Sequence, residues 1–246
     1  MTNTSLKWTC IHPTRERVER GIEAVQIWTK AAAHPESVHY YLCVDDDDPC
    51  FAGYQDAFLK DDPILNTLGK KTIVSVKNRG ASIVDAVNQG AAASSEPYLI
   101  VPTDDFYPCQ NWDTVLSERI EQFLEGKNHR QAVVHINDNT FVNSYFTMQI
   151  VTREYYDHWG YMLYPEYLTQ QADNDFTETA RRYNHITQSV IEAMDINFAH
   201  QSPDFVDKFE RDAVFSRNKE TQPQGTEVWF RRCAINFGFP MNIVPW

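Results

Sequence analysis

The chain has 246 residues, of which 42% are hydrophobic and 13% aromatic, with only 9 glycines and 12 prolines. This composition is typical of a folded globular protein and excludes a disordered or collagen-like chain. The 22 Lys and Arg residues against 34 Asp and Glu residues give a net charge of -12, which argues against a protein whose main task is to coat nucleic acid or an anionic membrane.

In the first half of the chain, short strand patterns alternate with helical patterns. Strands are expected at 6–11, 38–44, 72–76 and 98–101, and helices at 18–28 and 82–93. The second helix begins with the capping pattern Ser82-x-x-Asp85. Because strands that alternate with helices form βαβ units, we predict an α/β fold whose mixed, mostly parallel sheet is flanked by helices in a single domain over 1–246.

The second half of the chain is less regular. We expect helices at 112–123 and 175–183, and strands at 132–136, 146–151 and 196–199. After residue 202 the pattern favours two amphipathic helices, with the polar stretch 219–225 as the loop between them.

Cysteine usage and hydropathy indicate the compartment. The five cysteines are scattered without a Cys-x-x-Cys pair, so neither a disulfide framework nor a zinc site is indicated. No apolar run is long enough to span a membrane, and the first residues lack the apolar segment of a signal peptide. We therefore expect a cytoplasmic protein with reduced thiols.

Acidic residues follow two of the predicted strands. Asp45 opens the acidic run 45–48 after strand 38–44, and Asp104 and Asp105 follow strand 98–101. Ligands of parallel α/β sheets bind beyond the carboxyl ends of the strands, and carboxylates there need a cation, a donor or water. Mg²⁺ or Mn²⁺ is the natural partner, although a solvated turn explains these two acids equally well. The remaining acids of the run, 46–48, are expected to be solvated loop.

A longer constellation supports the metal-binding alternative. It consists, in order, of Asn78-Arg79-Gly80-Ala81-Ser82-Ile83, Asn88, Ala91, Glu96-Pro97-Tyr98-Leu99-Ile100 and Thr103-Asp104-Asp105. This series resembles glycosyltransferases of the GT-A fold, in particular family 2 and the spore-coat polysaccharide type. The turn Pro13-Thr14-Arg15 and Asp45 match the nucleotide-binding layout of the same family. The resemblance covers the first half well and the second half through short motifs, and it implies a nucleotide-sugar-binding half over about 1–110 and an acceptor-binding half with C-terminal helices over about 111–246.

The resemblance also implies a donor site and a metal site. Asp45 would accept a hydrogen bond from the base, Arg79 would lie near base or phosphate, and Asp104 would meet the ribose. The acid pair is a DxD-like motif in which Asp105 would bind the metal, Mn²⁺ or Mg²⁺, with His200 completing the metal shell after the strand at 196–199. The implied donor-binding set is Pro13, Thr14, Arg15, Asp45, Asn78, Arg79 and Asp104.

The catalytic base of the family is an acid at the start of a helix. By resemblance this is Asp175 in Asp173-Asn174-Asp175, with Asp173 as the alternative because the first acid of the family's pair is an amide here. Either residue could instead merely cap the helix. The implied acceptor contacts are Trp112, Tyr164 and Asp173.

The sequence therefore predicts a metal-dependent glycosyltransferase that moves a sugar from a nucleotide-diphosphate sugar, with UDP as the expected nucleotide, to an acceptor hydroxyl with inversion. Two alternatives stay open: a nucleotidyltransferase, although the turn after the first strand is poor in glycine, and a binding module of the same fold without catalysis. The acceptor could be a glycan, a lipid-linked sugar, a protein, a small molecule or a modified DNA base. The net charge disfavours DNA, and the lack of an apolar span disfavours an integral lipid-linked system.

Overall fold

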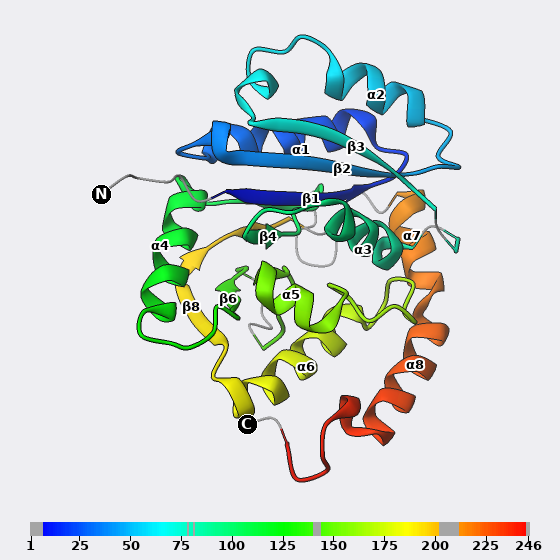
Figure 1. Cartoon of the computed structure of the whole chain (residues 1–246). Coiled ribbons are helices and arrows are strands. Elements are labelled where there is room, and N and C mark those ends of the chain that lie inside the picture. The colour runs from blue at the N-terminus through cyan, green and yellow to red at the C-terminus, as the bar shows by residue number, and fades with distance from the viewer. Residues whose placement is uncertain (1–6, 78, 81, 140–143, 202–211, 245–246) are drawn as a thin grey trace.

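The computed structural model describes residues 7–77, 79–80, 82–139, 144–201 and 212–244. Its centre is a seven-stranded sheet of order β3-β2-β1-β4-β7-β6-β8 (Figure 1). Only β7 runs antiparallel to its neighbours, which confirms the mixed, mostly parallel sheet. The strands are β1 Trp8–Thr14, β2 Val38–Asp45, β3 Lys70–Val76, β4 Tyr98–Ile100, β6 Val133–Asn137, β7 Ile150–Thr152 and β8 Val190–Asn197.

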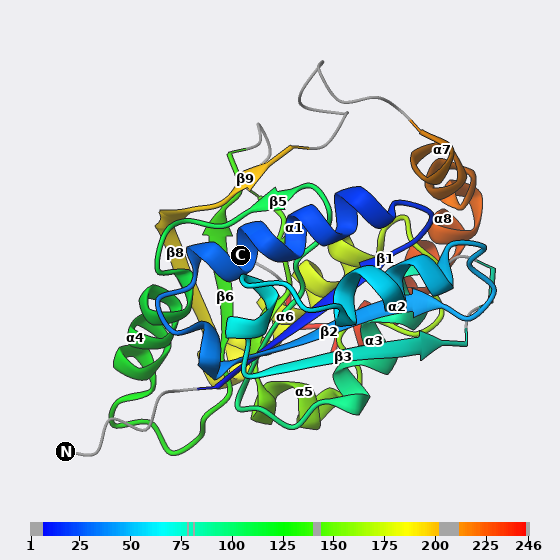
Figure 2. The same cartoon turned by 90° about the horizontal axis from the view of Figure 1, so that it is seen from above.

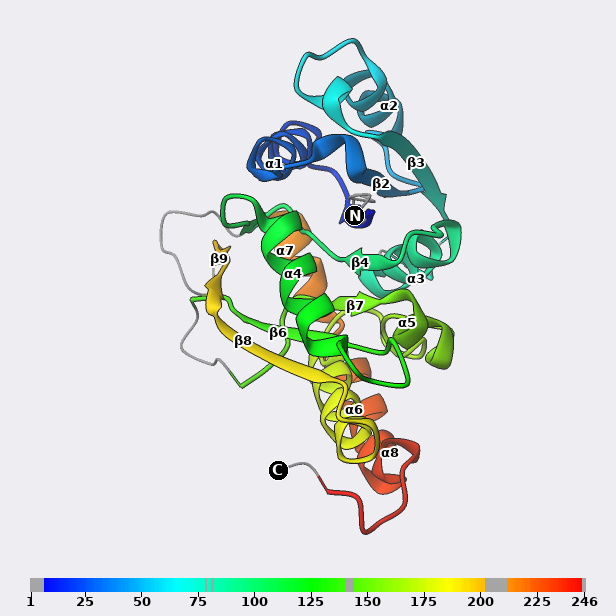
Figure 3. The same ribbon diagram turned by 60° about the vertical axis from the view of Figure 1, so that its left-hand side comes forward.

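Helices cover both faces of this sheet, and each face has its own apolar core. One core joins the sheet to α1 Val18–Ala31, α2 Phe51–Leu59 and α4 Trp112–Leu124, and the other joins it to α3 Ile83–Ala93, α5 Arg153–Trp159 and α6 Ala172–Thr187. Figure 3 shows α1 and α2 on the opposite side of the first strands from α3. A sheet buried on both faces explains why its strands read as nearly continuous apolar runs in the sequence.

Local chemistry explains two features of the first βαβ units. The hydroxyl of Ser82 accepts a hydrogen bond from the Asp85 N–H at 3.1 Å, which confirms the predicted cap of α3. Gly90 lets α3 pack closely on the sheet, because a Cβ there would lie 2.5 Å from Cγ2 of Ile11 and 2.6 Å from Sγ of Cys43. The spacing between α3 and the carboxyl halves of β1 and β2 therefore depends on a missing side chain.

A second, two-stranded sheet pairs β5 Phe106–Tyr107 with β9 Ala199–His200. In its antiparallel register Phe106 lies opposite His200, and the N–H of Gln201 donates to the carbonyl of Asp105 at 2.7 Å. Figure 2 shows β9 beside β5, next to α1. This pairing brings the end of the predicted strand 196–199 to the loop that carries the acid pair.

The structure corrects the predicted C-terminal region. The stretch 219–225 is not a loop, since α7 Ala213–Glu220 and α8 Gln222–Ala234 are separated only by Thr221. Gly225 lies buried inside α8, where a Cβ would come within 2.3 Å of the Gln170 carbonyl oxygen. A glycine is therefore required at position 225 for the packing of α8. In the sequence, the same glycine among polar residues is typical of a loop.

Other elements differ in extent or were not predicted. The sequence pattern gave no sign of α2 or α5, and most of β8 lies before the strand expected at 196–199. The described residues also form three short 3-10 helices, η1 Pro35–Ser37, η2 Leu65–Thr67 and η3 Asn236–Gly238. Among the helices that the structure describes, none is both long enough and apolar enough to cross a membrane.

Candidate active site

A cavity of about 400 Å³ opens at the carboxyl ends of β1, β2 and β4. Its wall includes the last residues of β1 and β2, residues that follow β1 and β4, one residue of β9, the first turn of α6 and much of α7. The polar and charged residues of the wall include Thr14, Arg15, Arg17, Asp45, Thr103, Asp104, Asp105, Gln149, Asp173, His200, Arg217 and Lys219. The two strands that the sequence predicted to end in acidic residues, β2 and β4, therefore do end at one cavity.

Most of the residues implied for the donor site lie on this wall. Pro13, Thr14, Arg15, Asp45 and Asp104 all line the cavity. Asn78 lies outside the described residues, so the structure says nothing of its place.

Arg79 does not join this group, contrary to the expectation. Its side chain is half exposed, forms an ion pair with Asp85 at 2.8 Å and donates to the Pro165 carbonyl at 2.6 Å. Arg79 thus ties the loop before α3 to the segment before α6 and is not among the residues that line the cavity.

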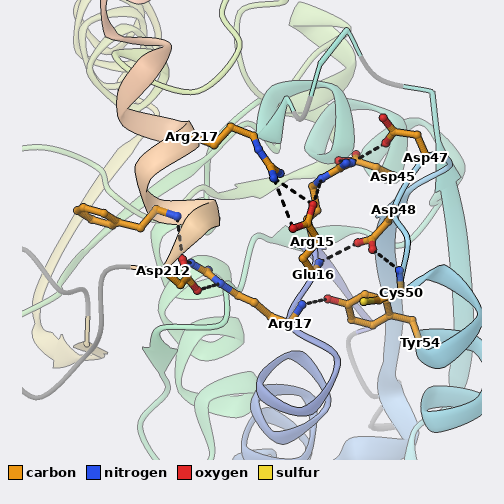
Figure 4. Close-up of polar contacts among 11 residues, drawn as sticks. Arg15, Glu16, Arg17, Asp45, Asp47, Asp48, Cys50, Tyr54, Asp212 and Arg217 are labelled. Carbon is orange, nitrogen blue, oxygen red and sulfur yellow. Dashed lines mark hydrogen bonds and ion pairs between the residues drawn. The ribbon is translucent and has the colours of Figure 1, made fainter.

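Arg15 and Asp45 form an ion pair at the β1–β2 side of the cavity (Figure 4). Nη1 of Arg15 lies 2.8 Å from Oδ2 of Asp45 and 2.5 Å from Oδ1 of Asp47. Partial burial acts to lower the pKa of Arg15, but the hydrogen bonds and charges of the two aspartates outweigh it and raise the pKa above its ordinary value. Asp45 itself is buried. If Arg15 moves away, another cation or hydrogen-bond donor must therefore take its place beside the Asp45 carboxylate.

Asp48 is part of the scaffold of the site, not of a solvated loop as expected. The residue is buried, and its carboxylate accepts from the backbone N–H of Cys50 at 2.7 Å and from that of Glu16 at 2.9 Å. Asp48 therefore fixes the loop after β2 to the loop after β1.

A buried network holds Asp104. Nε2 of His12 donates to Oδ1 of Asp104 at 2.8 Å, and the Thr14 hydroxyl donates to Oδ2 at 3.2 Å. On its other side the His12 ring lies 2.7 Å from the hydroxyl of Tyr40. Sequence reasoning overlooked His12, a fully buried polar residue inside an apolar strand, although that contrast was a usable signal.

Asp105 and His200 lie side by side on the wall. Oδ2 of Asp105 is 3.7 Å from Nε2 of His200, and the Thr103 hydroxyl donates to Asp105 at 2.5 Å. Burial alone would raise the pKa of Asp105, but His200 and Thr103 outweigh it and lower the pKa to about 2. The imidazole is stacked on the ring of Phe106, with centroids 4.1 Å apart, which fixes its direction.

The donor chemistry of this pair fits a divalent cation. A carboxylate oxygen and an imidazole nitrogen suit Mn²⁺, and the carboxylate also suits Mg²⁺. Among the residues described, no three His, Cys, Asp or Glu side chains gather to form a metal cage. The pair can thus supply two ligands, and a cation held there would take its remaining ligands from water or from a bound molecule.

The two candidate bases at the start of α6 have different surroundings. Asp173 lines the cavity, with Oδ1 accepting from the Asn174 N–H at 2.9 Å. Asp175 is almost fully buried, and both its oxygens bond to the guanidinium of Arg232 on α8, at 2.7 and 3.2 Å. This arrangement contradicts the expectation for Asp175, because a carboxylate enclosed by an arginine cannot reach an acceptor.

The remaining acceptor candidates are structural as well. Trp112 has no exposed surface and donates from its indole to the carbonyl of Trp28 at 3.0 Å within the core. Tyr164 lies under the guanidinium of Arg232, 4.0 Å from the ring centroid, and not on the cavity wall. The wall instead offers Thr147 and Gln149, which no sequence pattern singled out.

No protein-family model matches the chain, and no curated protein matches it. Solved structures do share its fold. The mannosyltransferase PcManGT from Pyrobaculum calidifontis, solved with GDP-Man and Mn²⁺, superposes with a TM-score of 0.64 at 14% identity, over 92% of this chain and 64% of that one. S. aureus TarS 1-349 superposes with TM-scores of 0.59 in complex with UDP and 0.58 in complex with UDP-GlcNAc, at 13% and 11% identity.

These superpositions also show how much of each protein is shared. The chain covers 73% of each of the two liganded TarS 1-349 structures, but 37% of a longer TarS structure, for which the TM-score is 0.57 at 13% identity. In turn, 96% of this chain is covered by the complex with UDP and 93% by the complex with UDP-GlcNAc. The seven-stranded sheet and its helices thus share the fold of these glycosyltransferase structures, in agreement with the fold that the sequence resemblance implied.

Proposed function

We propose that this protein is a metal-dependent glycosyltransferase that uses a nucleotide-diphosphate sugar. The observation that carries the proposal is the meeting of Asp45, Asp105, Asp173 and His200 on one cavity at the carboxyl edge of a GT-A-like sheet. Neighbours of this fold were solved with UDP, UDP-GlcNAc or GDP-Man, which supports a nucleotide sugar as the donor.

We assign the nucleobase of the donor to the β1–β2 side of the cavity. Asp45 is an acceptor at that end, and the imide N–H of uracil is a matching donor. Arg15 neutralises Asp45 and is held in place by it. We therefore retain UDP as the expected nucleotide.

Asp105 and His200 are the residues that would hold the divalent cation. When bound, that cation would supply positive charge to the diphosphate leaving group. Asp104 lines the same side, but His12 and Thr14 already occupy its two oxygens, so its proposed task is to hold the loop that carries Asp105 as well as to meet the ribose.

Asp173 replaces Asp175 as the proposed general base. It lies on the cavity wall that the second half of the chain contributes, as does Gln149, which makes that half the proposed acceptor side. Burial raises the pKa of Asp173 above its ordinary value, and the Asn174 N–H and His200 only partly offset this effect. A raised pKa makes the carboxylate a better proton acceptor from a sugar hydroxyl, and attack from this side, opposite the diphosphate, inverts the anomeric configuration.

The binding of nucleoside diphosphates tests the proposal, because this measurement does not require the acceptor to be known. Thermal unfolding is followed with UDP, GDP, CDP, ADP and TDP, each with Mn²⁺, with Mg²⁺ and with EDTA. A ligand at 100 times its dissociation constant stabilises the native state by about 2.7 kcal/mol, which raises the melting temperature of a chain this size by a few degrees. We expect one diphosphate to give a shift that EDTA removes.

The matched control is a carboxylate of similar charge outside the cavity. Asp105→Asn should abolish the metal-dependent shift, whereas Asp195→Asn should keep it, because Asp195 pairs with Arg119 on the exposed side of β8. If no diphosphate shifts the wild-type protein under any metal condition, the donor site does not exist and the proposal fails.

A further inference from the structure

Two arginines of the cavity wall share one glutamate. Oε1 of Glu16 accepts from Nε of Arg15 at 3.1 Å and from an Nη of Arg217 at 3.1 Å (Figure 4). Arg15 follows β1, whereas Arg217 lies on α7, about two hundred residues further along the chain, and both line the cavity. The Glu16 carboxylate therefore lies between two guanidinium groups that come from segments far apart in the sequence.

The backbone presents Glu16 to these arginines in a strained conformation. Its φ is +55°, in the left-handed region that glutamate rarely adopts. The buried Asp48 holds the peptide there by accepting from the Glu16 N–H at 2.9 Å. Such strain persists only where the surroundings impose it, and it gathers at ligand sites.

Arg217 has unused hydrogen-bonding capacity. Its Nη1 is buried and has no hydrogen-bond partner within the described part of the chain, while the other Nη is bonded to Glu16. A buried guanidinium N–H without an acceptor is costly, so an acceptor that reaches it gains binding energy. Because Arg217 lines the cavity, a ligand anion that turns its guanidinium toward the cavity would supply that acceptor.

The helix that carries Arg217 is itself tied to the same loop. Arg17 forms a two-point ion pair with Asp212, with both N···O distances at 2.6 Å, and Asp212 caps α7 by accepting from the Phe215 N–H. No residue of α7 is buried, so polar contacts do much to fix its place over the cavity. Arg217 is thus held near Glu16 even when the Glu16 carboxylate is exchanged for another anion.

We propose that Glu16 holds the place of an anionic group between Arg15 and Arg217, and that a phosphate of a nucleoside diphosphate displaces it on binding. A phosphate oxygen has the charge to accept from Nε of Arg15 and from the Nη of Arg217 that Glu16 now holds, while Nη1 of Arg15 keeps its bond to Asp45. This inference rests on the proposed function, which supplies the nucleoside diphosphate as the ligand. It assigns Arg217 to phosphate recognition and makes Glu16 a built-in competitor.

Opposite effects of two substitutions test the competition. Arg217→Gln should weaken the binding of the diphosphate that the wild-type protein prefers by about 10- to 100-fold, since a charged hydrogen bond is lost. Glu16→Gln should strengthen it by about two- to fivefold, since an internal ion pair no longer has to be broken. Calorimetric titrations with the diphosphate, the corresponding nucleoside and inorganic pyrophosphate separate phosphate recognition from base recognition.

The nucleoside should bind equally to all three proteins, and pyrophosphate should follow the order of the diphosphate. Arg231→Gln is the matched control. Arg231 lies on α8, forms an ion pair with Glu166 at 2.7 Å and is not among the residues that line the cavity. Circular dichroism checks that each variant keeps the wild-type helix content.

Two outcomes overturn the inference and leave the proposed function intact. Equal weakening by Glu16→Gln and Arg217→Gln would show a purely structural clamp, and equal changes in nucleoside affinity would place the effect at the base. If pyrophosphate binds to the wild-type protein and the two variants with the expected order of affinities, but no nucleoside diphosphate binds, the proposed function fails while the anion site stands. If it binds neither, both fail.

Discussion

Arg232 on α8 and Asp175 on α6 form a buried, two-point ion pair with N···O distances of 2.7 and 3.2 Å. The hydroxyl of Tyr167 also donates to this carboxylate, at 3.2 Å. Burial raises the pKa of Asp175, and Arg232 works against that rise. The pair fastens α8 to the helix that bears Asp173, and it therefore supports the site from behind without touching the cavity.

Breaking this pair should cost stability. Arg232→Met leaves a buried carboxylate without its cation and should lower the free energy of unfolding by about 3–5 kcal/mol. Urea unfolding followed by circular dichroism measures the loss. The double substitution Asp175→Leu with Arg232→Met should be less harmful than the sum of the two single changes, and strict additivity would contradict the coupling.

Asp173 should govern turnover and not donor binding. Asp173→Asn removes the proposed base and should lower the rate of release of the nucleoside diphosphate from the donor sugar by about 10²- to 10⁴-fold, with donor affinity within a factor of about two. Initial rates and calorimetry supply the two numbers. Asp195→Asn is again the matched control, and a comparable fall in donor affinity for Asp173→Asn would refute the assignment.

His200 should set the choice of metal. Replacing it by alanine removes the imidazole nitrogen and leaves the Asp105 carboxylate, so Mn²⁺ should lose its advantage over Mg²⁺ in supporting donor binding. Metal titrations at a fixed concentration of the diphosphate measure the half-saturating concentration of each ion. We expect that value to rise about tenfold or more for Mn²⁺, and an unchanged value would exclude His200 from the metal shell.

Glu96 should make the stability of the protein depend on acid pH. Its carboxylate lies 2.6 Å from Nδ1 of His39 and accepts from the Thr9 hydroxyl and the Ser95 N–H. Burial acts to raise its pKa, but these donors outweigh burial and lower the pKa from 4.5 to about 2. The unfolded chain therefore binds the proton more readily than the folded one.

The sign of this effect follows from linkage. The stabilisation by Glu96 is fully present above its unfolded pKa of 4.5 and is lost as the pH falls from there towards 2. Melting temperatures between pH 6 and pH 2.5 should fall less steeply in Glu96→Gln than in the wild-type protein. Parallel pH profiles for the two proteins would show that the pKa of Glu96 is not lowered.

Local patterns in the sequence were enough for the donor side of the fold. The strands β1, β2 and β4 and the capped helix α3 follow from alternation, periodicity and a Ser-x-x-Asp cap, all of which act within a few residues. Since parallel strands end at one edge of the sheet, Asp45, Asp104 and Asp105 could be placed near one another without a structure. In contrast, α2 gave no local signal and most of β8 lay outside the expected strand, so these elements depend on packing.

Tertiary structure decided which acids face the ligand. Asp173 and Asp175 are two residues apart, and about 100° per residue on a helix turns them to nearly opposite sides. Which side faces the cavity depends on Arg232, 57 residues further along the chain, because a buried carboxylate is stable only beside its cation. The sequence by itself determined the sheet and its acidic edge through short-range chemistry, whereas the proposed base, the place of Arg217 and the buried role of Asp48 depend on contacts between distant segments that no local pattern encodes.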